Sequence, residues 1–258
     1  MEFFETHAHY DDEKFIDDRE IVIKKIKEEG VSKCVNVGCD LKSSKNSIEF
    51  SKKYDFFYAM CGIHPSKISL KDSELIKDLI ELENLIKSSD KVVAIGEIGL
   101  DYYWNKDTKE MQKKAFLMQI ELANKLNLPI SIHTRDAIDD TIKILKENKI
   151  KRGGILHCCP FNEFLVKTGL ENGFFIAFGG TCTFKNSKNA KEIVNMVPLD
   201  KILIETDSPY LAPEPVRGTR NDSSNLKYIV EKIAEFKKCS PKEIAKITYE
   251  NAERIFNM

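Results

Sequence analysis

The chain opens on Glu2-Phe3-Phe4-Glu5-Thr6-His7-Ala8-His9, the stretch that begins the pattern from which its fold can be predicted. This stretch has the apolar pair Phe3 and Phe4 near its start and then places two histidines two residues apart. Residues two apart in a β-strand point to the same face, so His7 and His9 are expected to reach one site from the end of a buried strand. Imidazole is the commonest metal ligand in proteins, so the pair predicts part of a metal site; two incidental histidines are the alternative.

The rest of the chain repeats this beginning, because short apolar runs alternate with longer amphipathic runs rich in Lys and Glu. The short runs predict eight strands, over Glu2–His9, Lys33–Gly38, Phe56–Gly62, Val92–Gly96, Pro129–His133, Gly154–His157, Phe174–Phe178 and Lys201–Glu205. The longer runs predict helices over Glu20–Glu29, Ser43–Tyr54, Ser73–Lys87, Lys109–Leu126, Asp136–Glu147, Glu163–Glu171, Ala190–Met196 and Ser223–Phe236. A final helix is predicted over Pro241–Phe256, since Ser240 and Pro241 suit a helix cap and first position.

This alternation predicts one closed barrel. Strands that alternate with helices run parallel, and continuous apolar strands are typical of a sheet covered on both faces. Eight repeats in 258 residues predict a (β/α)₈ TIM barrel, as a single α/β domain over residues 1–258 with an extra C-terminal helix. An open doubly wound sheet is the alternative; it would normally carry a GxGxxG turn after its first strand, and this chain has none there.

Composition restricts the partners of such a domain. With 40 basic and 41 acidic residues, the chain cannot bind nucleic acid through bulk positive charge, so metal ions and a few arginines would have to do so. Its seven cysteines form no CxxC pair, which indicates reduced thiols and no structural zinc site. No apolar run approaches the ~20 residues of a membrane span. We therefore expect a cytoplasmic protein with no membrane partner.

The polar residues at the strand ends predict where the chemistry lies. TIM-barrel sites form at the carboxyl ends of the strands, and the chain's five histidines all fall at such ends: His7, His9, His64, His133 and His157. Glu97, Glu205 and Asp207 also follow apolar runs. A buried carboxylate is costly unless it is paired or binds a cation. For Glu97 and Asp207 the alternative is a salt bridge to Arg135, Arg217 or Arg220.

The number of candidate ligands predicts two metal ions. Four histidines and two carboxylates exceed what one tetrahedral zinc needs, but they suit two cations that share a bridging carboxylate. Glu97 is the expected bridge. Paired cations about 3.5–4 Å apart are a common device for hydrolysing phosphate esters.

Six segments of the chain resemble the TatD-type metal-dependent deoxyribonucleases, and the resemblance spans nearly the whole chain. The segments are Thr6-His7-Ala8-His9, Gly62-Ile63-His64-Pro65, Val93–Tyr103, His133-Thr134-Arg135-Asp136-Ala137, Leu156-His157-Cys158 and Leu203–Pro213, the last followed by Arg217-Gly218-Thr219-Arg220-Asn221. The resemblance implies a TIM barrel that cleaves phosphodiester bonds in DNA with a metal-activated water.

The resemblance also implies a ligand set and a partner. One divalent ion, Mg, Mn or Zn, would be held by His7, His9, Glu97 and Asp207. A second would be held by Glu97, His133 and His157. His64, Arg135, Arg217 and Arg220 would lie near the substrate phosphate. The expected partner is DNA, as single strands or 3′ ends, and the oligomeric state is left open.

Roles can be assigned to the remaining polar residues. Asp207 is the expected general base, and Glu205 is expected to act beside it or to orient ligands and water. Arg135 is expected to stabilise the transition state, with a salt bridge to Asp136 or Glu205 as the alternative.

The aromatic residues that follow Asp101 have two possible roles. Tyr102, Tyr103 and Trp104 could stack on a base or pack on the barrel rim.

Two departures from the family pattern bear on the substrate. Glu5 stands where family members usually have Asp. Cys158-Cys159-Pro160-Phe161 replaces the usual Cys-Phe-Ser-Gly in a loop that is expected to border the cleft, so the shape of the substrate that the cleft accepts could differ. The alternative enzyme is a related hydrolase acting on an amide or on another ester, such as aminoacyl-tRNA. Glu97, in place of a modified lysine, argues against the amide. A binding protein without catalysis is the third reading, and the complete ligand set argues against it.

Overall fold

The computed structural model describes residues 1–104 and 106–258, and in them eight parallel strands follow one another around a barrel in sequence order. The strands are β1 (Phe3–Ala8), β2 (Val31–Val37), β3 (Phe57–Cys61), β4 (Val92–Asp101), β5 (Ile130–Arg135), β6 (Gly154–Leu156), β7 (Phe175–Phe178) and β8 (Ile202–Ile204). This confirms the predicted TIM barrel.

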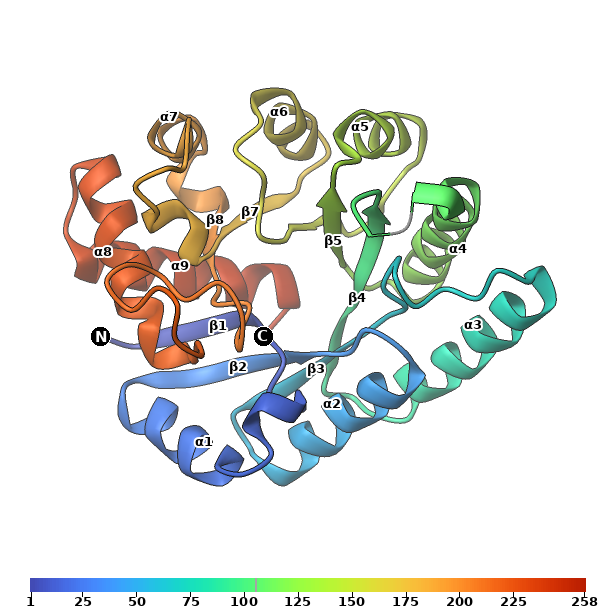
Figure 1. Cartoon of the computed structure of the whole chain (residues 1–258), viewed down its shortest axis with the longest axis horizontal. Helices are drawn as coiled ribbons and strands as arrows, with labels where there is room; N and C mark the ends of the chain where they lie inside the picture. The colour runs from blue at the N-terminus through green and yellow to red at the C-terminus, as the bar shows by residue number, and fades with distance from the viewer. Residues whose placement is uncertain (105) are drawn as a thin grey trace.

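Helices surround the strands, as Figure 1 shows for α1 to α8. The α-helices are α1 (Arg19–Glu28), α2 (Leu41–Lys53), α3 (Asp72–Lys87), α4 (Lys109–Leu126), α5 (Ile138–Glu147), α6 (Glu163–Glu171), α7 (Ala190–Met196), α8 (Leu226–Lys237) and α9 (Pro241–Phe256). The short 3₁₀ helices are η1 (Glu13–Phe15), η2 (Lys106–Thr108), η3 (Gly180–Thr183), η4 (Leu199–Lys201) and η5 (Ser223–Asn225). None of the helices in these ranges combines the length and apolar character of a membrane span.

The barrel closes where β8 meets β1. Ala8 and Ser208 form an isolated parallel bridge, and the Thr6 hydroxyl donates a hydrogen bond to the Ile204 carbonyl at 2.8 Å. The buried Glu5 carboxylate accepts hydrogen bonds from the Thr206 N–H at 2.9 Å and from its hydroxyl at 2.6 Å. Burial outweighs these hydrogen bonds and raises the pKa of Glu5 to about 7. Glu5 therefore joins the first and last strands of the barrel.

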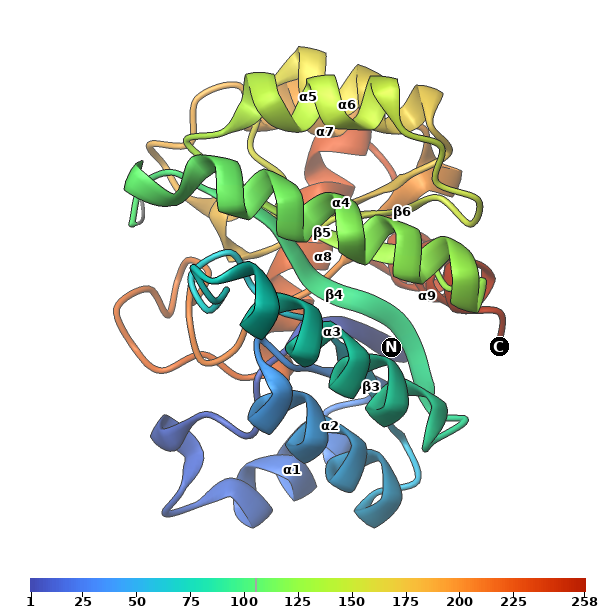
Figure 2. The ribbon, with the colours of Figure 1, turned by 90° about the vertical axis from the view of Figure 1, so that its right-hand side faces the viewer.

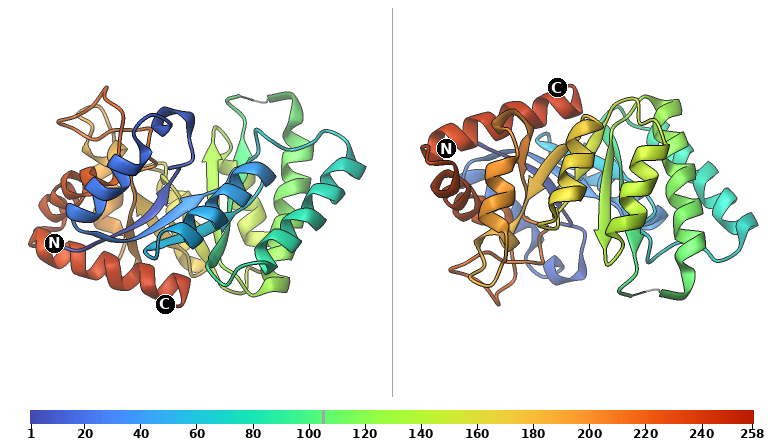
Figure 3. Two further views of the ribbon diagram at one scale, coloured as in Figure 1. Left: turned by 90° about the horizontal axis from the view of Figure 1, so that it is seen from below. Right: turned by 90° about the horizontal axis from the view of Figure 1, so that it is seen from above.

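Helix α9 packs against the amino-terminal end of the barrel. Its first turn is capped by the Ser240 side chain, which accepts the Glu243 N–H at 3.2 Å, and Pro241 occupies its first position. Its last residues join a second apolar cluster inside the strands: Phe4, Val35, Val37, Met60, Val93, Ala94, Ile155, Phe175, Ala177, Leu203, Ala252, Ile255 and Phe256. Figure 3 shows α9, in red, opposite the loops that follow β1 and β8. The extra helix predicted from the sequence thus covers the amino-terminal end of the barrel.

Strands β1 and β4 depart from regular pairing where the predicted ligands lie. The register of β1 shifts between Glu5 and Ala8, and that of β4 shifts between Ile95 and Ile98. Such irregularities re-aim side chains and are common beside active sites. Strand β4 also runs further than the predicted Val92–Gly96 and is the long green strand of Figure 2. His7 and Glu97 stand within these shifted segments.

Candidate metal centre

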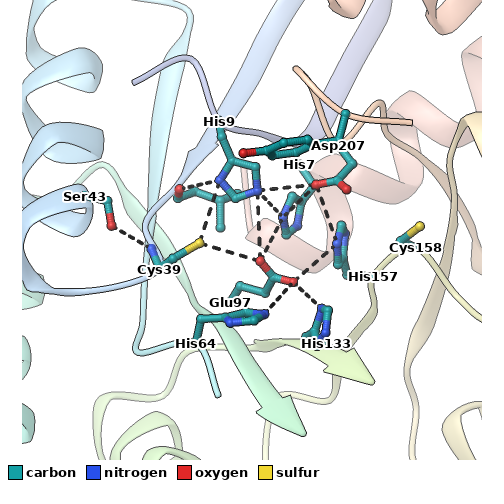
Figure 4. Close-up of polar contacts among 12 residues, drawn as sticks. His7, His9, Cys39, Ser43, His64, Glu97, His133, His157, Cys158 and Asp207 are labelled. Atoms are coloured by element: carbon teal, nitrogen blue, oxygen red, sulfur yellow. Dashed lines mark hydrogen bonds and ion pairs between the residues drawn. The ribbon is translucent and has the colours of Figure 1, made fainter. Parts of the chain in front are cut away.

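Five strands bring all six predicted metal ligands to the carboxyl end of the barrel. His7 lies in β1 and His9 follows it, Glu97 lies in β4, and His133 lies in β5. His157 directly follows β6, and Asp207 follows β8. Figure 4 shows the six side chains turned toward one another. Their ligand atoms lie around the two oxygens of Glu97, and we describe one group for each oxygen.

The first group contains His7, His9, Asp207 and one oxygen of Glu97. The Nε2 atoms of His7 and His9 are 3.3 Å apart, and Asp207 Oδ1 lies 3.9 Å and 3.4 Å from them. Glu97 Oε2 lies 3.7 Å from the Nε2 of His7 and 4.0 Å from that of His9. Ligand atoms bound at about 2.0–2.2 Å to one tetrahedral ion would be separated by about 3–4 Å, so the atoms of His7, His9 and Asp207 are spaced for a common cation, and Glu97 Oε2 has this spacing from both histidines.

The second group uses the other oxygen of Glu97. Glu97 Oε1 lies 2.7 Å from His133 Nδ1 and 3.5 Å from His157 Nε2. The two oxygens of this buried carboxylate therefore face different pairs of histidines. A carboxylate that bridges two cations requires this arrangement.

The outward nitrogens of three of these histidines lie within 3.1 Å of oxygen atoms, and for His9 and His133 this contact is a hydrogen bond. His9 Nδ1 lies 2.9 Å from the Val37 carbonyl, and His157 Nδ1 lies 2.8 Å from Glu205 Oε1. His133 Nε2 lies 3.1 Å from Asp101 Oδ2. Acceptors of this kind fix the tautomer and direction of metal-binding imidazoles.

Sequence reasoning did not select Asp101 as a functional residue. The sequence feature that could have indicated Asp101 is its spacing from Glu97. The two are separated by an even number of residues, so if the strand continues to Asp101 both side chains lie on the same face.

The electrostatics of the centre fit a divalent cation. In the described ranges, the ion pairs of Glu97 and Asp207 are all with histidines, so the arginine salt bridges considered as alternatives do not form. Burial opposes the charge of Glu97, but the surrounding histidines hold its pKa well below the usual range. Burial also opposes a charge on His7, and for this basic group it therefore lowers the pKa. The Nδ1 of His7 has no hydrogen-bond partner in the described chain. Four imidazoles and two carboxylates without a lysine or arginine make a donor set that suits bound metal.

His64 faces the centre with a defined tautomer. Its Nδ1 lies 2.7 Å from the Ser66 hydroxyl and 3.1 Å from the Ser66 backbone nitrogen; with Nδ1 as the acceptor of that backbone N–H, the proton is assigned to Nε2. That Nε2 lies 3.8 Å from Glu97 Oε1. Burial lowers the pKa of His64 to about 4, so the ring is neutral at pH 7 and can donate a hydrogen bond toward the centre.

The predicted substrate arginines lie outside the ligand groups. Arg220 forms a two-point ion pair with Asp18, at 2.8 Å and 2.6 Å, and Arg217 lies over the Phe184 ring at 4.1 Å. Arg135 is exposed at the end of β5, and its guanidinium lies 4.0 Å from the Tyr103 ring centroid. Within residues 1–104 and 106–258 Arg135 makes no ion pair, so the alternative salt bridge is not formed. The predicted phosphate contacts of these arginines stay predictions.

Cys39 is a second neighbour of the centre that sequence reasoning did not select. Its Sγ lies 3.7 Å from Glu97 Oε2 and 3.9 Å from His9 Nδ1 (Figure 4). Its backbone N–H donates to the Ser43 hydroxyl at 2.8 Å, which holds the loop after β2. The signal was its place directly after a strand. All seven cysteines are free thiols, as their spacing predicted.

Comparison with known proteins agrees with this geometry. A family model described as "TatD related DNase" matches residues 4–257. The chain is 45% identical over 259 residues to YabD of Bacillus subtilis, an uncharacterized metal-dependent hydrolase, with 99% of each chain covered. It is 35% identical to another such hydrolase, YcfH of Escherichia coli, covering 100% of this chain and 97% of the relative. The crystal structure of the Escherichia coli TatD homolog YJJV superposes with a TM-score of 0.92 at 26% identity, covering 99% and 98% of the two chains.

Proposed function

The chain belongs to the TatD-related DNase family of metal-dependent hydrolases, and on that premise we propose that it cleaves phosphodiester bonds in DNA at a centre of two divalent cations. The observation that supports two ions is the division of Glu97, whose Oε2 faces His7 and His9 while its Oε1 faces His133 and His157. Bound cations of this kind acidify water and neutralise charge on a phosphate.

The proposed ligands divide as the distances do. His7, His9, Asp207 and Glu97 Oε2 would hold one cation, and Glu97 Oε1, His133 and His157 would hold the other. Imidazole and carboxylate ligands accept Mg, Mn or Zn, so the donor set does not select among these ions.

Three side chains are proposed to act on the substrate. Asp207 would accept a proton as general base, since its contacts within the centre use Oδ1 and Oδ2 remains for the proton. His64 would donate a hydrogen bond from its Nε2–H to a phosphate oxygen, and Arg135 would add positive charge. Glu205 is fully buried against His157, so we assign it the positioning of that ligand rather than contact with substrate.

Cleavage of end-labelled single- and double-stranded DNA, with Mg, Mn and Zn compared, tests the proposal. Replacing Glu97 by Ala removes the only proposed bridge, so activity should fall at least about a hundredfold, the loss that removing a ligand's outer partner alone can cause. The matched control is Glu49→Ala, an exposed carboxylate on α2, which should cleave like the wild type. Wild-type cleavage by the Glu97→Ala variant would show that the site is misassigned. A parallel assay with mischarged tRNA tests the alternative substrate. Hydrolysis of the aminoacyl-tRNA ester without cleavage of DNA would favour that reaction.

A further inference from the structure

Two large aromatic side chains stand exposed beside the metal centre. Tyr102 is the first residue after β4, and Tyr103 and Trp104 follow it. The exposed fractions of the Tyr103 and Trp104 side chains are 49% and 67%. Tyr102 is buried, and its hydroxyl donates to Asp140 at 2.7 Å. The three aromatics therefore divide: the first packs on the barrel rim, and the next two face solvent. Tyrosine and tryptophan rings combine a large apolar face with a polar group, which suits them to contact a ligand at an exposed site.

Asp101 holds this aromatic pair at a fixed place relative to the centre. Its Oδ1 accepts the backbone N–H groups of Tyr103 at 2.9 Å and Trp104 at 3.0 Å. Its Oδ2 lies 3.1 Å from His133 Nε2. One buried carboxylate thus links the aromatic turn to a proposed metal ligand.

Arg135 adds a cation to the pair. It is paired in register with Asp101 across β4 and β5, and its guanidinium lies 4.0 Å from the Tyr103 ring centroid and 5.5 Å from that of Trp104. The two rings are 4.8 Å apart and nearly perpendicular, at 89°. Arginine and aromatic faces together suit a flat ring joined to an anion, which is the chemistry of a nucleotide with an unstacked base.

We propose that Tyr103, Trp104 and Arg135 form a stacking subsite for one unpaired nucleobase next to the phosphate that is cleaved. The inference rests on the proposed function, which supplies the phosphodiester. A base inside a duplex cannot reach such a subsite without being unstacked, so single strands and frayed ends should bind better than closed duplexes. Stacking is tolerant of base identity, so no sequence preference is expected.

Trp104 is the only tryptophan in the chain, and its emission reports directly on the subsite. The protein in magnesium buffer is mixed rapidly with oligothymidylate, and emission is followed before cleavage. An abasic strand of equal length and phosphate number is the comparison. Oligothymidylate should quench Trp104 and bind about tenfold more tightly than the abasic strand, the scale of one base stacked on an aromatic ring.

Variants separate stacking from general loss of structure. Trp104→Leu should lose most of this tenfold preference, as measured by the anisotropy of a labelled strand, and Trp104→Phe should keep it. The matched control is Phe56→Leu. Phe56 lies before β3, at the opposite end of the barrel, and also has a cation over its ring, the Lys27 ammonium at 5.3 Å. This control should bind both strands like the wild type.

The outcomes distinguish the subsite from the proposed reaction. Equal affinity for the base-bearing and abasic strands, with unchanged Trp104 emission, overturns the subsite even if DNA is hydrolysed. A preference that survives Trp104→Leu overturns it as well. Quenching and a lost preference in Trp104→Leu support the subsite even if the protein hydrolyses no DNA, in which case only the proposed reaction fails.

Discussion

Asp101 fixes a proposed ligand and a loop with one side chain. It is 1% exposed, and His133 and the backbone N–H groups after β4 satisfy both of its oxygens. Burial opposes its charge, but these hydrogen bonds, led by that from His133, lower its pKa. The carboxylate therefore stays ionised and can hold the His133 ring with Nδ1 toward Glu97.

Replacing Asp101 by Asn should weaken metal binding more than it weakens the fold. The amide keeps the side chain's size but loses the charge that orients His133, so metal affinity should fall about 10–100-fold. Isothermal titration with zinc or manganese measures this change. Asp139→Asn, an exposed acidic residue in the first turn of α5, is the control and should bind metal like the wild type. Unchanged affinity in Asp101→Asn would contradict the assigned role.

At the scale of elements, β4 and β5 approach each other closely where the ligands lie. Gly99 pairs with His133 between these strands and has a φ of +135°. A Cβ at this position would stand 2.1 Å from the His133 carbonyl oxygen. Only glycine tolerates both the backbone conformation and this contact, so Gly99 permits His133 to stand beside Glu97.

Gly99→Ala should therefore lower both stability and metal affinity. The unfavourable φ alone costs about 1–3 kcal/mol, and the clash adds to it by displacing β5. Gly173→Ala is a matched control, because Gly173 also has a positive φ, of +78°, but a Cβ there would meet nothing within 4 Å. Urea unfolding should show a larger loss for Gly99→Ala than for Gly173→Ala, and only the former should weaken metal binding. Equal losses with intact metal binding would argue against the close approach.

At the scale of the whole molecule, the metal centre joins strands that are distant in sequence. Its residues come from both ends of the chain and from three strands between them, and the barrel closes beside it through Glu5 and Thr206. A cation bound only when these strands are assembled must stabilise the folded state, since the unfolded chain offers no such site.

Removing metal should lower the melting temperature. A cation at about a thousandfold its dissociation constant stabilises the fold by about 4 kcal/mol, and a chelator should abolish that gain. Calorimetry with and without chelator measures the shift, and Glu97→Ala should melt at one temperature under both conditions. A wild type indifferent to chelator would contradict a metal centre assembled from these strands.

The sequence alone determined the barrel, the final helix and the candidate ligands. These features are local: apolar runs and their spacing define strands and helices, and the carboxyl end of each strand is known once the strand is. His7, Glu97 and His133 could be assigned to one site without knowing any contact between them.

Only the tertiary structure decided how these residues divide the work. The sequence did not show which oxygen of Glu97 faces which histidines, or that Asp101 and Cys39 contact His133 and Glu97. Nor did it show the contact of Tyr102 with Asp140 or the pairing of Arg220 with Asp18. The physical reason is that each depends on contacts between segments distant along the chain. The irregular register of β1 and β4, within which His7 and Glu97 lie, is an example that no local pattern encodes.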